Sequence, residues 1–129
     1  MAHPNEEAVR KAYEAFAAGD MDTVQSILDP GVKWHVVGRS SLAGTYEGID
    51  QVIEFLGRIM QITDGTFRVD IQDVLANDDY AVTLAHVHAQ RAGRTLESEE
   101  AHVSSMKAGR VAEFWALTED QYAVDEFFG

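Results

Sequence analysis

Residues 80–117 alternate between apolar and polar side chains in three successive segments, and this run limits the possible folds more than any other feature. Short turns at Ala92-Gly93 and Ala108-Gly109 separate the segments 80–91, 96–107 and 110–117. A period of two is typical of strands with one face in the core, and two-residue turns join neighbouring antiparallel strands. The run therefore predicts consecutive antiparallel strands in one sheet.

Apolar residues at helical spacing lie before this run, and a further helix is expected after it. Asn5 is a candidate N-cap for the first helix, which ends at Gly19, and Asp20 or Asp22 is a candidate for the second. The other expected features are a turn at 29–31, a strand at 32–37, a helix from about 48 to 62, a strand beginning near 67, and a capping box at 118–121. This order predicts an α+β fold with helices on one face of a curved sheet. A pocket is expected between the two layers.

Composition limits the function classes. The 129 residues suit one domain, 1–129, and the absence of cysteine excludes disulfides and thiolate zinc sites. The net charge of −12 repels phosphate backbones and anionic lipids, so neither nucleic acid nor membrane is an expected partner. No segment reads as a signal peptide or a membrane span, and we expect a cytoplasmic protein.

The hairpin turn at 108–109 predicts which side chains share a face. With Lys107 opposite Arg110, an uninterrupted register puts Ser104 opposite Glu113 and His102 opposite Trp115. His102 and Glu113 are then diagonal neighbours on the pocket face, where a buried acid–base pair is a functional candidate. The same face is expected to contribute the ligand contacts Val87, Met106 and Trp115.

The segment 32–37 places a Trp directly before a His. Alternation points Trp34 inward as a pocket wall and His35 outward, although His35 is also kept as a candidate base. On the expected helices, the apolar faces supply four further candidate ligand contacts. These are Tyr13, Phe16, Phe55 and Met60.

The outer face of the sheet is expected to hold a second cluster of titratable residues. His86 and His88 fall opposite Glu99 and Glu97, an arrangement open to two interpretations. Two histidines and two carboxylates are potential metal ligands. A ladder of opposite charges is the interpretation we favour. An extra residue at Gly93 would exchange the two faces of the strand that follows it.

Three stretches carry a family resemblance: "AYEAFAAGDMDTVQSILDPGVKWHVVG", "LAGTYEGIDQVIEFL" and "GRVAEFWALTEDQY". They resemble the SnoaL-like branch of the nuclear transport factor 2-like superfamily over nearly the whole chain. The resemblance implies a cone-shaped α+β barrel with a deep pocket, often in a homodimer. Members include polyketide cyclases, ketosteroid isomerases, limonene epoxide hydrolases and binding proteins.

The catalytic positions of these families correspond only in part. The tyrosine of the isomerases corresponds to Ala12, one residue before Tyr13, and their aspartate base corresponds to Val36 or His35. The nearest candidate for the histidine of the cyclases is His102.

Three hypotheses about function follow. The first is an isomerase- or cyclase-type enzyme that acts on an apolar, oxygenated compound such as a polyketide- or steroid-like ring. In it, His102 and Glu113 act as acid and base, and no metal ion or organic cofactor is implied. The second is a non-catalytic small-ligand-binding protein on the same scaffold. The third is a protein-interaction domain, which requires a filled cavity.

Overall fold

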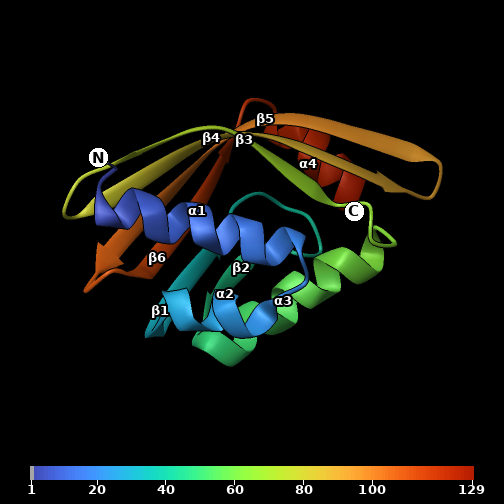
Figure 1. Ribbon diagram of the computed structural model, residues 1–129. Coiled ribbons are helices and arrows are strands. Elements are labelled where there is room, and N and C mark those ends of the chain that lie inside the picture. The colour runs from blue at the N-terminus through green and yellow to red at the C-terminus, as the bar shows by residue number, and fades with distance from the viewer. Residues whose placement is uncertain (1) are drawn as a thin grey trace.

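Four helices and six strands make up residues 2–129, which the computed structural model describes (Figure 1). The elements are α1 (Pro4–Ala17), α2 (Met21–Ile27), β1 (Leu28–Val36), β2 (Gly44–Glu47), α3 (Ile49–Ile62), β3 (Arg68–Ala76), β4 (Tyr80–Arg91), β5 (Arg94–Lys107), β6 (Arg110–Thr118) and α4 (Gln121–Phe128).

The strands form one curved, unclosed sheet in the order β2-β1-β6-β5-β4-β3. All neighbours are antiparallel except β1 and β6, which run parallel. Helix α1 packs against β3 and β4, α3 against β1 and β2, and α4 against β5 and β6. The α+β class, with helices against a curved and mostly antiparallel sheet, is therefore confirmed.

The two predicted hairpin turns are present, and both residues of each turn have a positive φ angle. Ala92 and Gly93 have φ of 49° and 78°, and Ala108 and Gly109 have φ of 51° and 77°. Two consecutive positive φ angles match the right-handed twist of the flanking strands. Arg91 therefore lies opposite Arg94 with no extra residue at Gly93, and the faces of β5 follow the predicted alternation.

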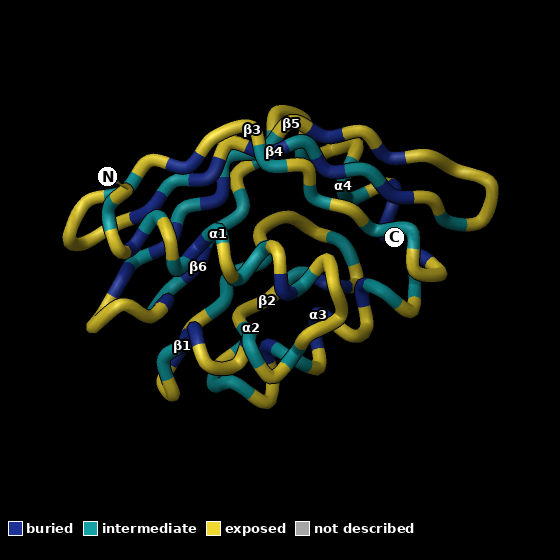
Figure 2. Tube along the Cα trace, in the orientation of Figure 1, coloured by how far each residue is buried: buried dark blue, intermediate teal, exposed yellow. Residues whose placement is uncertain are grey.

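Buried and exposed residues alternate along the central strands (Figure 2). The buried set on β4, from Ala81 to Ala89, faces the helices, and Val9, Val52 and Phe55 pack from the helix side. Apolar burial of this kind is the dominant favourable contribution to folding.

A bulge in β6 overturns one register prediction. Met106 pairs with Val111, but Ser105 pairs with Glu113, so Ala112 is an extra residue in β6. Because side chains alternate, one extra residue moves everything after it to the other face. Phe114 and Ala116 therefore face the helices, while Glu113 and Trp115 lie on the outer face.

The N-terminal half differs from its prediction in three places. Residues 29–31 do not turn the chain but continue β1, where the pairing with β6 shifts register between Leu28 and Lys33. Residues 44–47, which lie between the predicted strand and the predicted helix and were assigned to neither, form β2 against β1. His3, not Asn5, caps α1, because Pro4 occupies the first helical position and the Asn5 N–H donates to His3 Nδ1.

The start of α4 also differs from its prediction. Strand β6 continues through Thr118, so Thr118 cannot be the N-cap, and its hydroxyl donates to Gln121 Oε1 instead. Asp120 caps the helix by accepting from the Ala123 N–H at 3.1 Å. No helix within residues 2–129 combines the length and the apolar character that a membrane crossing needs.

Candidate functional site

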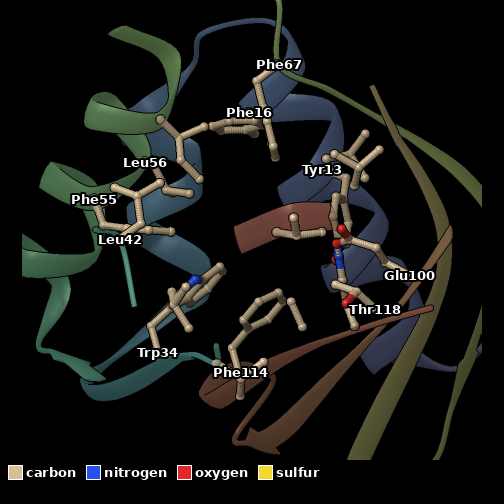
Figure 3. Close-up of a pocket in the computed structure, with 18 of the residues that line it drawn as sticks. Tyr13, Phe16, Trp34, Leu42, Phe55, Leu56, Phe67, Glu100, Phe114 and Thr118 are labelled. Carbon is tan, nitrogen blue, oxygen red and sulfur yellow. Dashed lines mark hydrogen bonds and ion pairs between the residues drawn. The ribbon is translucent and has the colours of Figure 1, made fainter. Parts of the chain in front are cut away.

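A cavity of about 160 Å³ lies between the concave face of the sheet and the helices. Its wall is mostly aromatic and aliphatic, and Figure 3 shows Phe16, Trp34, Leu42, Phe55, Leu56 and Phe114 along it. Trp34 and Phe114 stack with ring centroids 3.7 Å apart, so the bulge in β6 builds part of this wall. Polar groups gather at the opposite end, where Tyr13, Glu100 and Thr118 lie (Figure 3).

Three titratable side chains form a hydrogen-bonded chain at this polar end. The Nε2 of His102 lies 2.7 Å from the Oε1 of Glu100, and its Nδ1 lies 2.6 Å from the Oη of Tyr13. The side chains of His102 and Glu100 are only 6% and 8% exposed. With a neutral imidazole, Nε2–H donates to the Glu100 carboxylate and Nδ1 accepts from the Tyr13 hydroxyl, which satisfies both contacts.

The phenol of Tyr13 is held protonated. Burial raises its pKa far above the ordinary value, and the nearby Glu100 charge raises it further, while a hydrogen bond with Thr83 opposes the shift. Tyr13 is therefore a hydrogen-bond donor at neutral pH, not a base.

Glu100 also has a free carboxylate oxygen. Its Oε1 is bound to His102, and no described residue donates to its Oε2. Every fully buried side-chain nitrogen or oxygen in residues 2–129 has a partner, so Oε2 is not fully buried. Glu100 lines the cavity, and it also lines a hollow beside Leu84 and Leu117.

The predicted pair of His102 and Glu113 does not exist. The bulge at Ala112 places Glu113 on the outer face, where its Oε2 lies 2.6 Å from the Nε2 of His35. His35 also stacks on Trp115, with ring centroids 5.2 Å apart. Neither Glu113 nor His35 lines the cavity, so neither is placed to act on a molecule bound there.

The predicted ligand contacts divide into two groups. Those that line the cavity are Tyr13, Phe16, Trp34, Phe55 and Val87, together with His102. The bulge in β6 places Trp115 on the outer face of the sheet, so Trp115 does not line the cavity. Met106 is buried in the core at the turn end of β5, and neither it nor Met60 of α3 lines the cavity.

Glu100 was missed in the sequence, although a signal for it was present. Once His102 is placed inward on a strand, the residue two positions earlier must share its face. Glu100 is that residue, and it lines the cavity beside His102.

Loop 37–43 and α4 close one side of the cavity. Val37 and Leu42 line it from the loop, and Val124 and Phe128 line it from the helix. The Arg39 N–H donates to Asp125 Oδ2 at 3.0 Å, and the Ser41 N–H donates to the carbonyl of Gly129 at 2.6 Å.

The charge ladder on the outer face is present as expected. His86 lies between Glu97 and Glu99, and His88 contacts Glu97. Glu97 and then Glu99 raise the pKa of His86, and His86 and then His88 lower the pKa of Glu97. In the described part of the chain, no group of three or more His, Asp or Glu is arranged to hold a metal ion.

The chain is similar to known proteins along most of its length. The model of the SnoaL-like domain matches residues 9–114. The uncharacterized protein Rv0034 of Mycobacterium tuberculosis is 33% identical over 121 residues, which cover 93% of this chain and 92% of the relative. Bal32a, from a soil-derived mobile gene cassette, is 35% identical, with a TM-score of 0.94 over 98% of this chain and 97% of that one.

A more distant structure shares the fold. A nuclear transport factor 2-like protein of unknown function from Burkholderia pseudomallei is 24% identical, with a TM-score of 0.87 over 98% of both chains. The chain therefore belongs to the SnoaL-like family, and it shares its fold with this nuclear transport factor 2-like protein.

Proposed function

We propose that the cavity binds an apolar small molecule with an oxygen function, and that Glu100, His102 and Tyr13 catalyse acid–base chemistry on it. The family supports a pocket scaffold of the isomerase and cyclase type. The observation that carries the proposal is the buried carboxylate–imidazole–phenol chain at one end of an otherwise apolar cavity. Buried titratable groups in a cavity are costly to the fold and are typical of functional sites.

The reaction starts after the neutral imidazole of His102 has taken up a proton from solvent, so that both of its nitrogens carry protons. Nε2–H then donates to Glu100 and Nδ1–H donates to the oxygen of Tyr13, which leaves the phenol proton free for a ligand carbonyl. Glu100 takes a proton from the carbon next to that carbonyl, so that a C–H bond breaks and the carboxylate becomes neutral.

Proton transfer at the other end balances the charge. Tyr13 delivers its proton to the carbonyl oxygen and recovers one from Nδ1 of His102, so an enol forms and the ion pair becomes a neutral pair. In an enol conjugated with a second C=C bond, Glu100 returns its proton to the far carbon of that bond, while the enol O–H proton goes to Tyr13 and the Tyr13 proton to Nδ1 of His102. The carbonyl is thereby restored, the double bond has moved, and the isomerisation is complete. Desolvation favours the neutral pair, which lowers the energy of the enol state.

A hydrogen–deuterium exchange assay tests this chemistry directly. Cyclic ketones incubated with the protein in D₂O should gain deuterium next to the carbonyl faster than in buffer. Glu100→Gln and Tyr13→Phe should each slow this exchange by at least about 100-fold, within the range for loss of a general acid or base. The outer-face control Glu113→Gln should exchange at the wild-type rate, and equal rates in all four proteins would refute the proposal.

We also propose a homodimer that forms through the outer face of the sheet. Leu84 on β4 and Leu117 on β6 lie on either side of Ala101 and are 40% and 51% exposed. Trp115 lies one cross-strand row away on the same face. Contiguous exposed apolar residues on a sheet face are typical of an interface.

A further inference from the structure

The polar end of the cavity holds one carboxylate and no fixed cation. Of the described residues that line the cavity, Glu100 is the one acidic residue, and none is Lys or Arg. His102 is the other ionisable group beside it, and both of its nitrogens already have partners in Glu100 and Tyr13. A ligand anion would therefore be buried next to the like charge of Glu100, and even a protonated His102 would have both of its N–H groups engaged by Glu100 and Tyr13, so no cation is free to pair with the ligand.

The polar end offers a donor and an acceptor close together. When His102 carries both protons, Tyr13 can donate its phenol proton to a ligand oxygen, and the Oε2 of Glu100 can accept from a ligand N–H, O–H or acidic C–H. The rest of the wall is aromatic or aliphatic. A ligand that fits this wall has one polar end and an uncharged apolar body.

The volume limits the body of the ligand. A dry cavity of about 150 Å³ in another protein holds one benzene ring. Pockets for drug-sized molecules span roughly 300–1,000 Å³. At about 160 Å³, this cavity matches the volume that holds one ring and lies below the range for drug-sized molecules.

We infer that the substrate class is a neutral carbonyl compound built on a single ring or a branched chain of similar size, and that Glu100 excludes carboxylates and phosphates. This inference rests on the proposed function, because it assumes that a ligand enters the cavity. It narrows the expectation of a polyketide- or steroid-like ring to compounds of one ring.

Three probes of matched shape test the inference on the wild-type protein. Benzamide and benzoate differ in charge at nearly equal size, and 2-naphthamide adds a second ring to benzamide. Their dissociation constants are measured at pH 7 by titration of protein NMR spectra. Benzamide should bind at least about 100-fold more tightly than benzoate, equivalent to about 2.8 kcal/mol, and more tightly than 2-naphthamide.

Three other outcomes would each contradict one part of the inference or of the proposed function. Benzoate binding within about threefold of benzamide would refute the exclusion of anions while leaving the pocket intact. Tighter binding of 2-naphthamide than of benzamide would refute the size limit. If no probe shifts any resonance at millimolar concentration, the cavity takes no ligand of this kind, and the proposed function fails together with the inference.

A variant pair identifies the cause of the charge selection. Glu100→Gln removes the negative charge at nearly constant shape and should strengthen benzoate binding by at least about tenfold, while benzamide changes less. Glu113→Gln makes the same change on the outer face and should leave both affinities unchanged. Equal benzoate affinities in the wild type and a folded Glu100→Gln variant would show that Glu100 does not select against anions. If that variant does not fold, the wild-type ratio of the two probes decides the inference.

Discussion

Removal of the Tyr13 hydroxyl tests the buried chain most directly. Tyr13→Phe deletes the donor to His102 Nδ1, a contact of 2.6 Å beside a side chain that is 6% exposed. A buried acceptor without a partner costs about 1–3 kcal/mol. We expect the free energy of unfolding to fall by about 2 kcal/mol, with a Tm decrease of roughly 3–5 °C per kcal/mol for a chain of this size.

A double-mutant cycle separates this contact from other effects of the substitution. His102→Gln removes Nδ1 but keeps an amide nitrogen near the place of Nε2, so Glu100 retains a donor. Since the hydrogen bond can be lost only once, Tyr13→Phe and His102→Gln should be non-additive by about 1–2 kcal/mol. Urea unfolding at pH 7, followed by tryptophan fluorescence, measures each corner of the cycle.

Glu113 supplies the matched control for the register of β6. Glu113→Gln and His102→Gln lie on opposite faces of the sheet and should add within about 0.5 kcal/mol. Additive effects for Tyr13 and His102, combined with coupling between Glu113 and His102, would refute both the bulge at Ala112 and the assignment of the buried chain.

Three further predictions concern other parts of the molecule. Gly38 has a φ of 100°, and a Cβ there would lie 2.2 Å from Asp125 Oδ1. Gly38→Ala should therefore lower the free energy of unfolding, measured in urea, by more than about 1 kcal/mol. The control Gly57→Ala, in open space on α3, should be neutral or stabilising. The raised pKa of His86 means that its ion pairs stabilise the fold below the unfolded histidine pKa and lose that effect as pH rises through the folded pKa. His86→Asn should therefore destabilise the protein more at pH 6 than at pH 9 in thermal unfolding, and an equal loss at both would contradict the sign. Sedimentation at micromolar concentration should show a dimer that Leu117→Asp converts to monomer; a wild-type monomer would refute the interface.

The sequence alone determined the features that depend on short-range geometry. Two-residue turns with positive φ join antiparallel neighbours whatever surrounds them, so the pairing of Thr83 with His102 followed from the position of Gly93. Alternation along one strand likewise predicted that Trp34 points inward and His35 outward. Neither the pairing across a short turn nor the alternation along a strand depends on which elements pack against the strand.

The bulge in β6 depends on contacts that chain spacing does not reveal. Continuous alternation from Val111 would have turned Glu113 toward the helices and Phe114 toward solvent. The extra residue at Ala112 instead buries Phe114 against Trp34 and sets Glu113 beside His35. Burial of an aromatic ring in place of a carboxylate favours this arrangement.

The partner that makes the bulge favourable is β1, which lies about 80 residues earlier in the chain and pairs in parallel with β6. Parallel neighbours are joined by long connections, so no short turn marks their register. The candidate site likewise depends on contacts between segments that lie far apart in the sequence. The residue types of Tyr13, Glu100 and His102 were visible in the sequence, but only the packing of α1 against the sheet brought the phenol to the imidazole.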